Sequence, residues 1–250
     1  MLLTIASREF RNLFLSPLAW AIMAVLQLIV AYLFLTQVDT YMVLQPRLAG
    51  IEGAPGVTDI VVAPLFQTVG FLFMLIAPAI TMRVFSDEKR NHTLSLLLSA
   101  PVSMSDIVLG KFLGVTLFFL VLLVMLTAMP ASLYAGTTLD TGKLAAGILG
   151  LALLLSSFAA IGVFMSSLTE QPVVAAVSTF GLLLLLWIID WSGSSKEKVA
   201  SLFGYLSMQA HLSSFLKGLF STTDVAYYVL LIALFLILAI RRLDQQRLTG

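Results

Sequence analysis

The sequence predicts an all-α, polytopic membrane protein in which residues 1–250 form a single domain with six transmembrane helices. Hydrophobic residues make up 60% of the chain and charged residues only 11%, whereas soluble domains carry about 25% charged residues. Six apolar runs approach the ~20 residues that a helix needs to cross the hydrocarbon of a bilayer. The net charge of +1 gives no reason to expect a nucleic-acid partner.

Three prolines mark the expected starts and bends of these helices. Pro17 is well placed in the first turn of the first span. Pro78 predicts a kink near the end of the second span, and Pro130 predicts a bend in the third, which is longer than a bilayer requires. The spans are expected at about 17–36, 60–82, 107–134, 144–168, 172–189 and 225–240.

Residues 1–16 show the pattern of an amphipathic helix that lies in the membrane interface before the first span. Apolar side chains recur at helical spacing, and polar or basic side chains fall on the opposite side. A frayed basic N-terminus is the alternative interpretation. The apolar set is Leu2, Leu3, Ala6, Phe10, Leu13 and Phe14, and the polar set is Thr4, Ser7, Arg8, Arg11 and Asn12.

Lysine and arginine are distributed unevenly between the two sides of the membrane, which predicts that both termini are cytoplasmic. The Arg241–Arg242 pair just past the last span would anchor that helix at the inner leaflet. The cytoplasmic set is Arg8, Arg11, Arg83, Lys89, Arg90, Lys111, Arg241, Arg242 and Arg247, and the outer set is Arg47, Lys143, Lys196, Lys198 and Lys217.

The chain lacks the motifs of membrane enzymes and of ion-driven transporters. The expected span interiors hold no ionisable residue, which counts against a proton- or sodium-coupled pump. No P-loop, His-Glu-x-x-His or Gly-x-Ser-x-Gly motif occurs, and there is no cysteine to act as a nucleophile or metal ligand. We therefore expect a non-enzymatic chain with no catalytic, cofactor-binding or metal-binding residues, which does not hydrolyse ATP alone.

Small residues recur along the fourth span. Ala152, Ser156 and Ala160 repeat every fourth position, and Gly162 is followed four residues later by Ser166. Such ladders allow helices to approach closely inside a membrane. Packing within one chain and a seam between two copies both fit this pattern.

A charged segment joins the second and third spans. Asp87, Glu88, Lys89 and Arg90 leave the membrane together, and residues 93–98 could form a short helix that Ala100-Pro101 ends. Ser103-x-x-Asp106 then resembles a capping box that opens the third span. A short apolar-faced helix held between two spans suits a groove on another protein. A solvated loop with a helix resting on lipid is the alternative.

The run from Glu88 to Ser103, followed by Ile107–Lys111, resembles the pattern of ABC type-2 transporter permeases. That pattern has acidic and basic residues, Gly-Thr-Leu-Glu, Leu-Leu-x-x-Pro and then Gly-Lys. The sequence departs from it at two positions, with His92 where glycine is usual and Ser95 where glutamate is usual. The second departure argues against a specific ion pair at Ser95 and leaves the helix–turn–helix plan intact.

Two further segments extend the resemblance over most of the chain. Residues 1–20 are similar to the elbow helix of this family, with Arg8, Phe10, Arg11 and Phe14 as its interfacial residues. The last outer loop is similar to that of the gliding-motility-associated permease subfamily; the residues concerned are Gly204–Ser207, His211, Phe215, Gly218 and Asp224–Tyr228.

The resemblance implies a half-transporter permease, an exporter rather than an importer, in the inner (plasma) membrane of a bacterium. It implies a second permease copy or a paralogue, two copies of an ABC ATPase that bind ATP and Mg²⁺, membrane lipid as the surrounding solvent, and an accessory outer-face protein. It assigns ATPase coupling to Asp87, Glu88, Lys89, Arg90, His92, Thr93, Leu94, Leu97, Leu98 and Pro101. A non-transporting membrane anchor of an ATPase-containing assembly or signalling complex is the alternative function.

The stretch 190–224 is the longest segment outside the expected spans. Its apolar residues recur at helical spacing in two groups, around Val199–Leu206 and Leu212–Leu219, which predicts two short amphipathic helices at the outer leaflet. By resemblance they help to gate an outer exit, and resting on lipid is the alternative. The candidate gate residues are Leu202, Phe203, Leu206, Phe215 and Leu219, and His211 is expected to be a surface histidine.

Overall fold

The computed structural model describes residues 1–48, 55–93, 103–189 and 205–249, and this part of the chain contains helices joined by short turns and no strands. The elements in chain order are α1 (Leu2–Leu15), α2 (Pro17–Leu48), the π-turn η1 (Thr58–Val62), α3 (Ala63–Thr81), α4 (Arg83–Arg90), α6 (Met104–Ala131), the 3₁₀ turn η2 (Ser132–Ala135), α7 (Thr141–Leu168), α8 (Pro172–Ile188), α10 (Met208–Leu216) and α11 (Thr222–Thr249).

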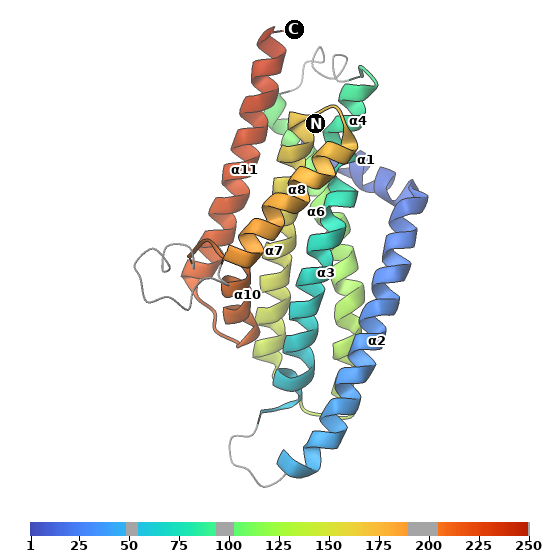
Figure 1. Cartoon of the computed structure of the whole chain (residues 1–250), viewed down its shortest axis with the longest axis vertical. Helices are drawn as coiled ribbons and strands as arrows, with labels where there is room; N and C mark the ends of the chain where they lie inside the picture. Colours follow the sequence, from blue (N-terminus) through green and yellow to red (C-terminus); the bar gives the residue numbers. More distant parts are fainter. Residues whose placement is uncertain (49–54, 94–102, 190–204, 250) are drawn as a thin grey trace.

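The long helices run along the longest axis of the molecule, and both chain termini lie at the same end (Figure 1). We call this the terminal end and the opposite one the far end. At the terminal end α1 lies across the bundle, and the extended backbone of Ser16 turns the chain into α2. The terminal end also holds α4, from which the chain enters residues 94–102, a segment outside the described residues.

Among the described residues, five helices are long and apolar enough to cross a membrane: Pro17–Arg47, Thr58–Arg90, Met104–Ala135, Thr141–Leu168 and Thr222–Arg247. The expected fifth span is α8, whose 17 residues fall short of the ~20 needed to cross hydrocarbon. The structure therefore supports five of the six predicted spans by length. Several helices are longer than the predicted spans. The spans were predicted from apolar runs, whereas the helices continue into the polar residues beside those runs.

The core forms around α7, which packs against α3, α4, α6, α8, α10 and α11. Gly162 of α7 lets Thr81 of α3 approach so closely that a Cβ atom at Gly162 would lie 2.1 Å from Thr81 Oγ1. Ser166, one turn further along α7, is fully buried against α4. The small residues Gly162 and Ser166 thus serve packing within the chain, one of the two alternatives that the sequence left open.

Helix α2 lies at the edge of the bundle (Figure 1). Many of its apolar side chains are exposed. Leu28, Tyr32 and Leu35 are among its most exposed residues. A soluble protein rarely leaves such a continuous apolar surface in water. Lipid is the solvent that matches it.

Helix α10 corrects the prediction of an amphipathic helix at the outer leaflet. Met208, Leu212 and Phe215 are completely buried, and the helix packs against α7, α3 and α8. Phe215 reaches the backbone of α7 at Gly150, where an added Cβ would lie 2.7 Å from Phe215 Cβ. The apolar face of α10 therefore meets protein, because a small residue on α7 makes room for it. Of the preceding predicted group, Val199–Leu206, residues 199–204 lie outside the described residues.

Candidate functional site

Two glycines bring α1 onto α6 at the terminal end. A Cβ atom at Gly110 would lie 2.8 Å from Ile5 Cβ, and one at Gly114 would lie 2.7 Å from Glu9 Cβ. Helices that lack side chains at the contact can pack backbone to backbone. Ala6 is buried in this contact, and Glu9 is held beside α6 at the height of Lys111.

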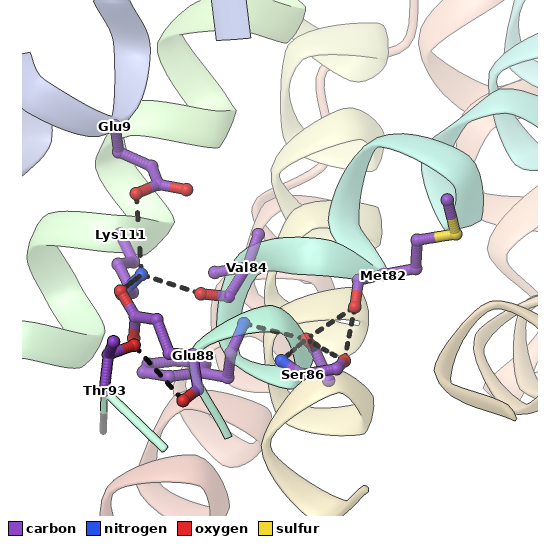
Figure 2. A network of polar contacts seen from close by, with 9 residues as sticks. Glu9, Met82, Val84, Ser86, Glu88, Thr93 and Lys111 are labelled. Atoms are coloured by element: carbon purple, nitrogen blue, oxygen red, sulfur yellow. Dashed lines mark hydrogen bonds and ion pairs between the residues drawn. The ribbon is translucent and has the colours of Figure 1, made fainter. Parts of the chain in front are cut away.

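Lys111 lies at the centre of a polar cluster that joins α1, α4 and α6 (Figure 2). Its ammonium group donates to Glu88 Oε1 and to the Val84 carbonyl, both at 2.7 Å, and lies 3.5 Å from Glu9 Oε2. It also lies 5.0 Å from the centre of the Phe85 ring. The side chain is only 4% exposed, and a buried charge is stable only when it is paired and hydrogen-bonded.

The sequence did not predict that Lys111 is buried. Lys111 belongs to the apolar helix Met104–Ala135 and points inward. Sequence reasoning placed it with the cytoplasmic charges because it stands near the start of the helix. A lysine in an apolar helix usually has a protein partner, but Glu9 is 102 residues away, and no local pattern relates the two.

A serine of α7 ties α4 to the bundle (Figure 2). Ser166 Oγ accepts hydrogen bonds from the backbone amides of Phe85 at 2.9 Å and Ser86 at 3.1 Å, and donates to the Met82 carbonyl at 3.0 Å. The hydroxyls of Ser86 and Ser166 lie 3.0 Å apart, and Ser86 Oγ also donates to the Met82 carbonyl. The helix break at Met82 frees backbone groups, and Ser166 satisfies them.

Lys89 makes a second connection between α4 and α7. The side chain is buried, and its ammonium donates to the backbone carbonyl of Ser167 in the last turn of α7. Carbonyls at the C-terminus of a helix lack intrahelical partners and carry partial negative charge, so they attract a cation. Glu88 and Lys89, two of the residues predicted to couple to an ATPase, therefore contact α6 and α7 respectively.

The end of α4 explains one departure from the permease pattern. The amide of His92 donates to the Lys89 carbonyl at 3.1 Å, and the amide of Thr93 donates to the Glu88 carbonyl at 3.0 Å. These two bonds form a Schellman motif. His92 occupies the left-handed position of the motif, with φ 54°, where glycine is the residue without steric cost. A glycine at this place in the pattern therefore has a conformational reason.

The other predicted coupling residues fall into two groups. Asp87 is half-buried on α4, and Arg90 is exposed at the end of the same helix. Leu94, Leu97, Leu98 and Pro101 lie outside the described residues. The described residues continue from Ser103, at the start of α6. The Ser103 hydroxyl accepts a hydrogen bond from the Asp106 amide at 3.1 Å, which confirms the predicted N-cap of the third span.

The residues assigned to the elbow divide between two faces of α1. Arg8 and Arg11 are exposed. Phe10 and Phe14 are partly buried, and their rings lie tilted against each other with centroids 4.9 Å apart. Phe14 also lies edge-on to Phe118 of α6, at a centroid distance of 5.2 Å. Leu3, expected on the apolar face, is 77% exposed, because Ile5 and Glu9 take the positions nearest to α6.

A second polar cluster lies between α10 and α11. His211 Nδ1 is 2.5 Å from Asp224 Oδ1, and His211 Nε2 is 3.0 Å from the Tyr205 carbonyl. The imidazole is stacked on Tyr227 at 4.1 Å. The prediction of a surface histidine is thus wrong, since the His211 side chain is only 9% exposed. Its partner is 13 residues away on another helix, beyond the reach of a helical pattern.

The candidate gate residues do not gather into one surface. Phe215 is buried against α7, whereas Leu206 and Leu219 are exposed. Leu202 and Phe203 lie outside the described residues. The apolar spacing correctly predicted helix α10, but it did not distinguish a face that packs on protein from a face that meets lipid.

Within the described residues, five long apolar helices form one bundle centred on α7, which is itself one of the five, and α2 leaves apolar surface uncovered. These features define a multi-pass membrane protein. The sequence matches the family model of the ABC-2 family transporter protein over residues 3–248, and the chain belongs to this family. Membership supports the role of membrane permease component of an ABC transporter, for which an ABC ATPase is the general partner. A comparison with curated proteins gives no match.

Proposed function

We propose that this chain is the permease subunit of an ABC exporter and that a separate ATPase docks on residues 88–98 and drives it. The chain itself is non-catalytic and holds no cofactor. ATP and Mg²⁺ bind to two copies of the ATPase, and the transporter contains a second permease, either another copy of this chain or a paralogue. Closure of the ATPase pair would favour one of two arrangements of the spans.

The observation that carries this proposal is the attachment of α4 on both sides. The segment that follows α4 leads directly into α6. Glu88 is bound to Lys111 of α6, and Lys89 is bound to the last turn of α7. A force on the segment would therefore reach three helices at once, because buried polar ties of this kind are costly to break.

The charges of the terminal end support a cytoplasmic location for both termini. Arg83 and Arg90 of α4 and the exposed Arg241 and Arg242 of α11 lie at this end, as the positive-inside rule requires. In this orientation α1 is the interfacial elbow. The inner membrane of a bacterium, the gliding-motility-associated subfamily and an accessory outer-face protein remain proposals that rest on the resemblance.

A cavity of about 460 Å³ suggests an amphiphilic cargo. It lies between α3, α8 and α10. Phe71, Leu184 and Trp187 give it an apolar lining, and Gln209 and Ser213 contribute the polar groups. Its volume falls within the ~300–1,000 Å³ typical of small-molecule sites. A cargo with one polar group and a larger apolar part would match this lining.

The docking proposal predicts that Leu94→Asp releases the ATPase. A carboxylate placed in an apolar interface loses its hydration, and a penalty of ~2 kcal/mol or more would weaken binding by at least tenfold. The measurement is co-purification of the ATPase with the permease in mild detergent. A second measurement follows the ATP-dependent movement of an amphiphile across vesicles that contain both subunits. Movement would show transport, whereas a membrane anchor would move nothing.

Leu3→Asp is the matched control, since Leu3 is an exposed leucine at the same end of the bundle. We expect this variant to retain the ATPase. Full association of Leu94→Asp would contradict docking on this segment. ATPase binding without any ATP-dependent transport would favour the membrane-anchor function.

A further inference from the structure

A cavity of about 280 Å³ lies at the terminal end among α1, α2, the α3–α4 junction and α6. One part of its lining is charged, and the other is apolar. Glu9, Arg83, Asp87, Glu88 and Lys111 form the charged part. Leu13, Leu18, Ala19, Ile22 and Ile80 are among the apolar residues. A site of this composition matches a ligand with a charged group at one end and hydrocarbon at the other.

Several charged groups of the lining can still bind a ligand. The Lys111 ammonium already donates hydrogen bonds to Glu88, Glu9 and the Val84 carbonyl. Arg83 and Asp87 stand one turn apart on α4, yet within the described part of the chain neither forms an ion pair. Glu88 Oε2 is buried and accepts no hydrogen bond from any described residue. The cavity thus offers one guanidinium and several carboxylate oxygens to a ligand.

We propose that this cavity binds the headgroup of a phospholipid that carries a primary amine, such as phosphoethanolamine. Arg83 binds the phosphate, for which a guanidinium is well suited. Asp87 and Glu9 bind the ammonium group, whose N–H donors match the available carboxylate oxygens. The acyl chains lie along Leu18 and Ile22 of α2 and Ile80 of α3.

The position of the cavity agrees with the depth of a headgroup. α1, which forms one wall, is amphipathic and lies across the end of the bundle. Trp20 at the start of α2 is 59% exposed, and its indole N–H donates to the Phe14 carbonyl at 2.7 Å. Exposed tryptophans are enriched at the membrane–water boundary. The volume also lies just below the ~300–1,000 Å³ of pockets that enclose whole small ligands, as expected for a headgroup alone.

The charges favour an amine over the other common headgroups. An anionic glycerol headgroup would bring no cation to Asp87 and Glu9. A choline headgroup carries the same charges as ethanolamine but has no N–H donors. Charged hydrogen bonds are roughly twice as strong as neutral ones, so the primary amine should gain most from this lining. This inference does not depend on ATPase docking or on transport.

Competition among lipids tests the site. The full-length protein in detergent is equilibrated with equal amounts of phosphatidylethanolamine, phosphatidylcholine and phosphatidylglycerol, and the lipids retained are measured by native mass spectrometry. We expect about tenfold preference for phosphatidylethanolamine, which corresponds to ~1.4 kcal/mol. Arg83→Gln should lower the retention of all three lipids, whereas Asp87→Asn should remove the preference for the amine.

Two exposed charges supply matched controls. Arg247→Gln and Asp244→Asn each remove a charge from α11 outside the cavity; both variants should bind lipid as the unaltered protein does. Circular dichroism and thermal unfolding verify that each variant is folded. Equal retention of the three lipids, or folded Arg83→Gln and Asp87→Asn variants with unchanged lipid binding, would overturn the proposal. Loss of ATPase association with unchanged lipid binding would instead assign the cavity to a protein partner.

Discussion

Lys111 connects three segments that are far apart in the chain. Its ammonium group meets the carboxylate of Glu9 on α1 and that of Glu88 on α4, while its own backbone belongs to α6. Removing one member of such a buried set leaves the others unpaired, a loss that typically costs ~3–5 kcal/mol for a fully buried pair. Glu88 is 27% exposed, so the cost here should fall below that range.

At the same scale, His92 provides a test of backbone conformation. His92→Gly and His92→Ala both remove the imidazole, but only alanine keeps a Cβ atom at the positive φ of this position. We expect the glycine variant to be more stable than the alanine variant by ~1 kcal/mol. Thermal unfolding of the two purified variants in the same detergent measures the difference.

The same pair of substitutions at an ordinary helical position should give the opposite order. Thr68 on α3 can serve as this control, because glycine in a helix interior is ~1 kcal/mol less favourable than alanine. Equal stability of His92→Gly and His92→Ala would show that the left-handed turn does not persist in the folded protein.

Close helix contacts set the packing at the scale of elements. Gly162 of α7 and Thr81 of α3 leave no room for another atom between them. Gly181 of α8 is different, since a Cβ there would meet nothing within 4 Å. Substituting each glycine by alanine therefore distinguishes a steric clash, at Gly162, from the general preference of helices for alanine, at Gly181.

We expect Gly162→Ala to destabilise the protein by ~1–3 kcal/mol, because overpacking forces helices apart. Gly181→Ala should be neutral or stabilising by up to ~1 kcal/mol, because alanine is the better helix former. Unfolding of both variants in detergent, followed by circular dichroism, checks the contrast. A stable Gly162→Ala variant would mean that α3 and α7 can shift without cost.

Helices were easier to predict than their surroundings. Apolar runs correctly indicated α2, α3, α6, α7 and α11, because only helices satisfy their backbone inside hydrocarbon. The burial of α10 was missed, since an apolar face suits lipid and protein equally in a membrane. The position of α8 was correct, but its described length is shorter than a full span.

At the scale of the whole molecule, the arrangement of the termini makes a topology prediction. The chain has no cysteine, so a single introduced thiol can be labelled specifically. Thr138→Cys places it at the exposed far end and Asp244→Cys at the terminal end. If the terminal end is cytoplasmic, a membrane-impermeant maleimide should label only Thr138→Cys in intact cells and both variants after permeabilisation. The reverse result would invert the orientation.

The candidate site shows where sequence reasoning stops for the molecule as a whole. The charged segment and the cap at Ser103 were visible as local patterns. The partners of Lys111 and Lys89 were not, because Glu9, Glu88 and Ser167 come together only when α1, α4 and α7 pack around α6. Contacts between residues far apart in the chain depend on how the helices pack, and a single sequence carries no periodic pattern that reveals this packing.

The tight crossing of Thr81 and Gly162 has a mechanical consequence. Helical dihedral angles at Met82 join α3 directly to α4, and the joined helices contact α7 at several levels, from Phe66 beside Gly147 through Thr81 at Gly162 to Ser86 at Ser166. Contacts over this whole length leave no single point about which α3 and α4 could pivot, so a push on Arg90 would displace α3, α4 and α7 together as one body.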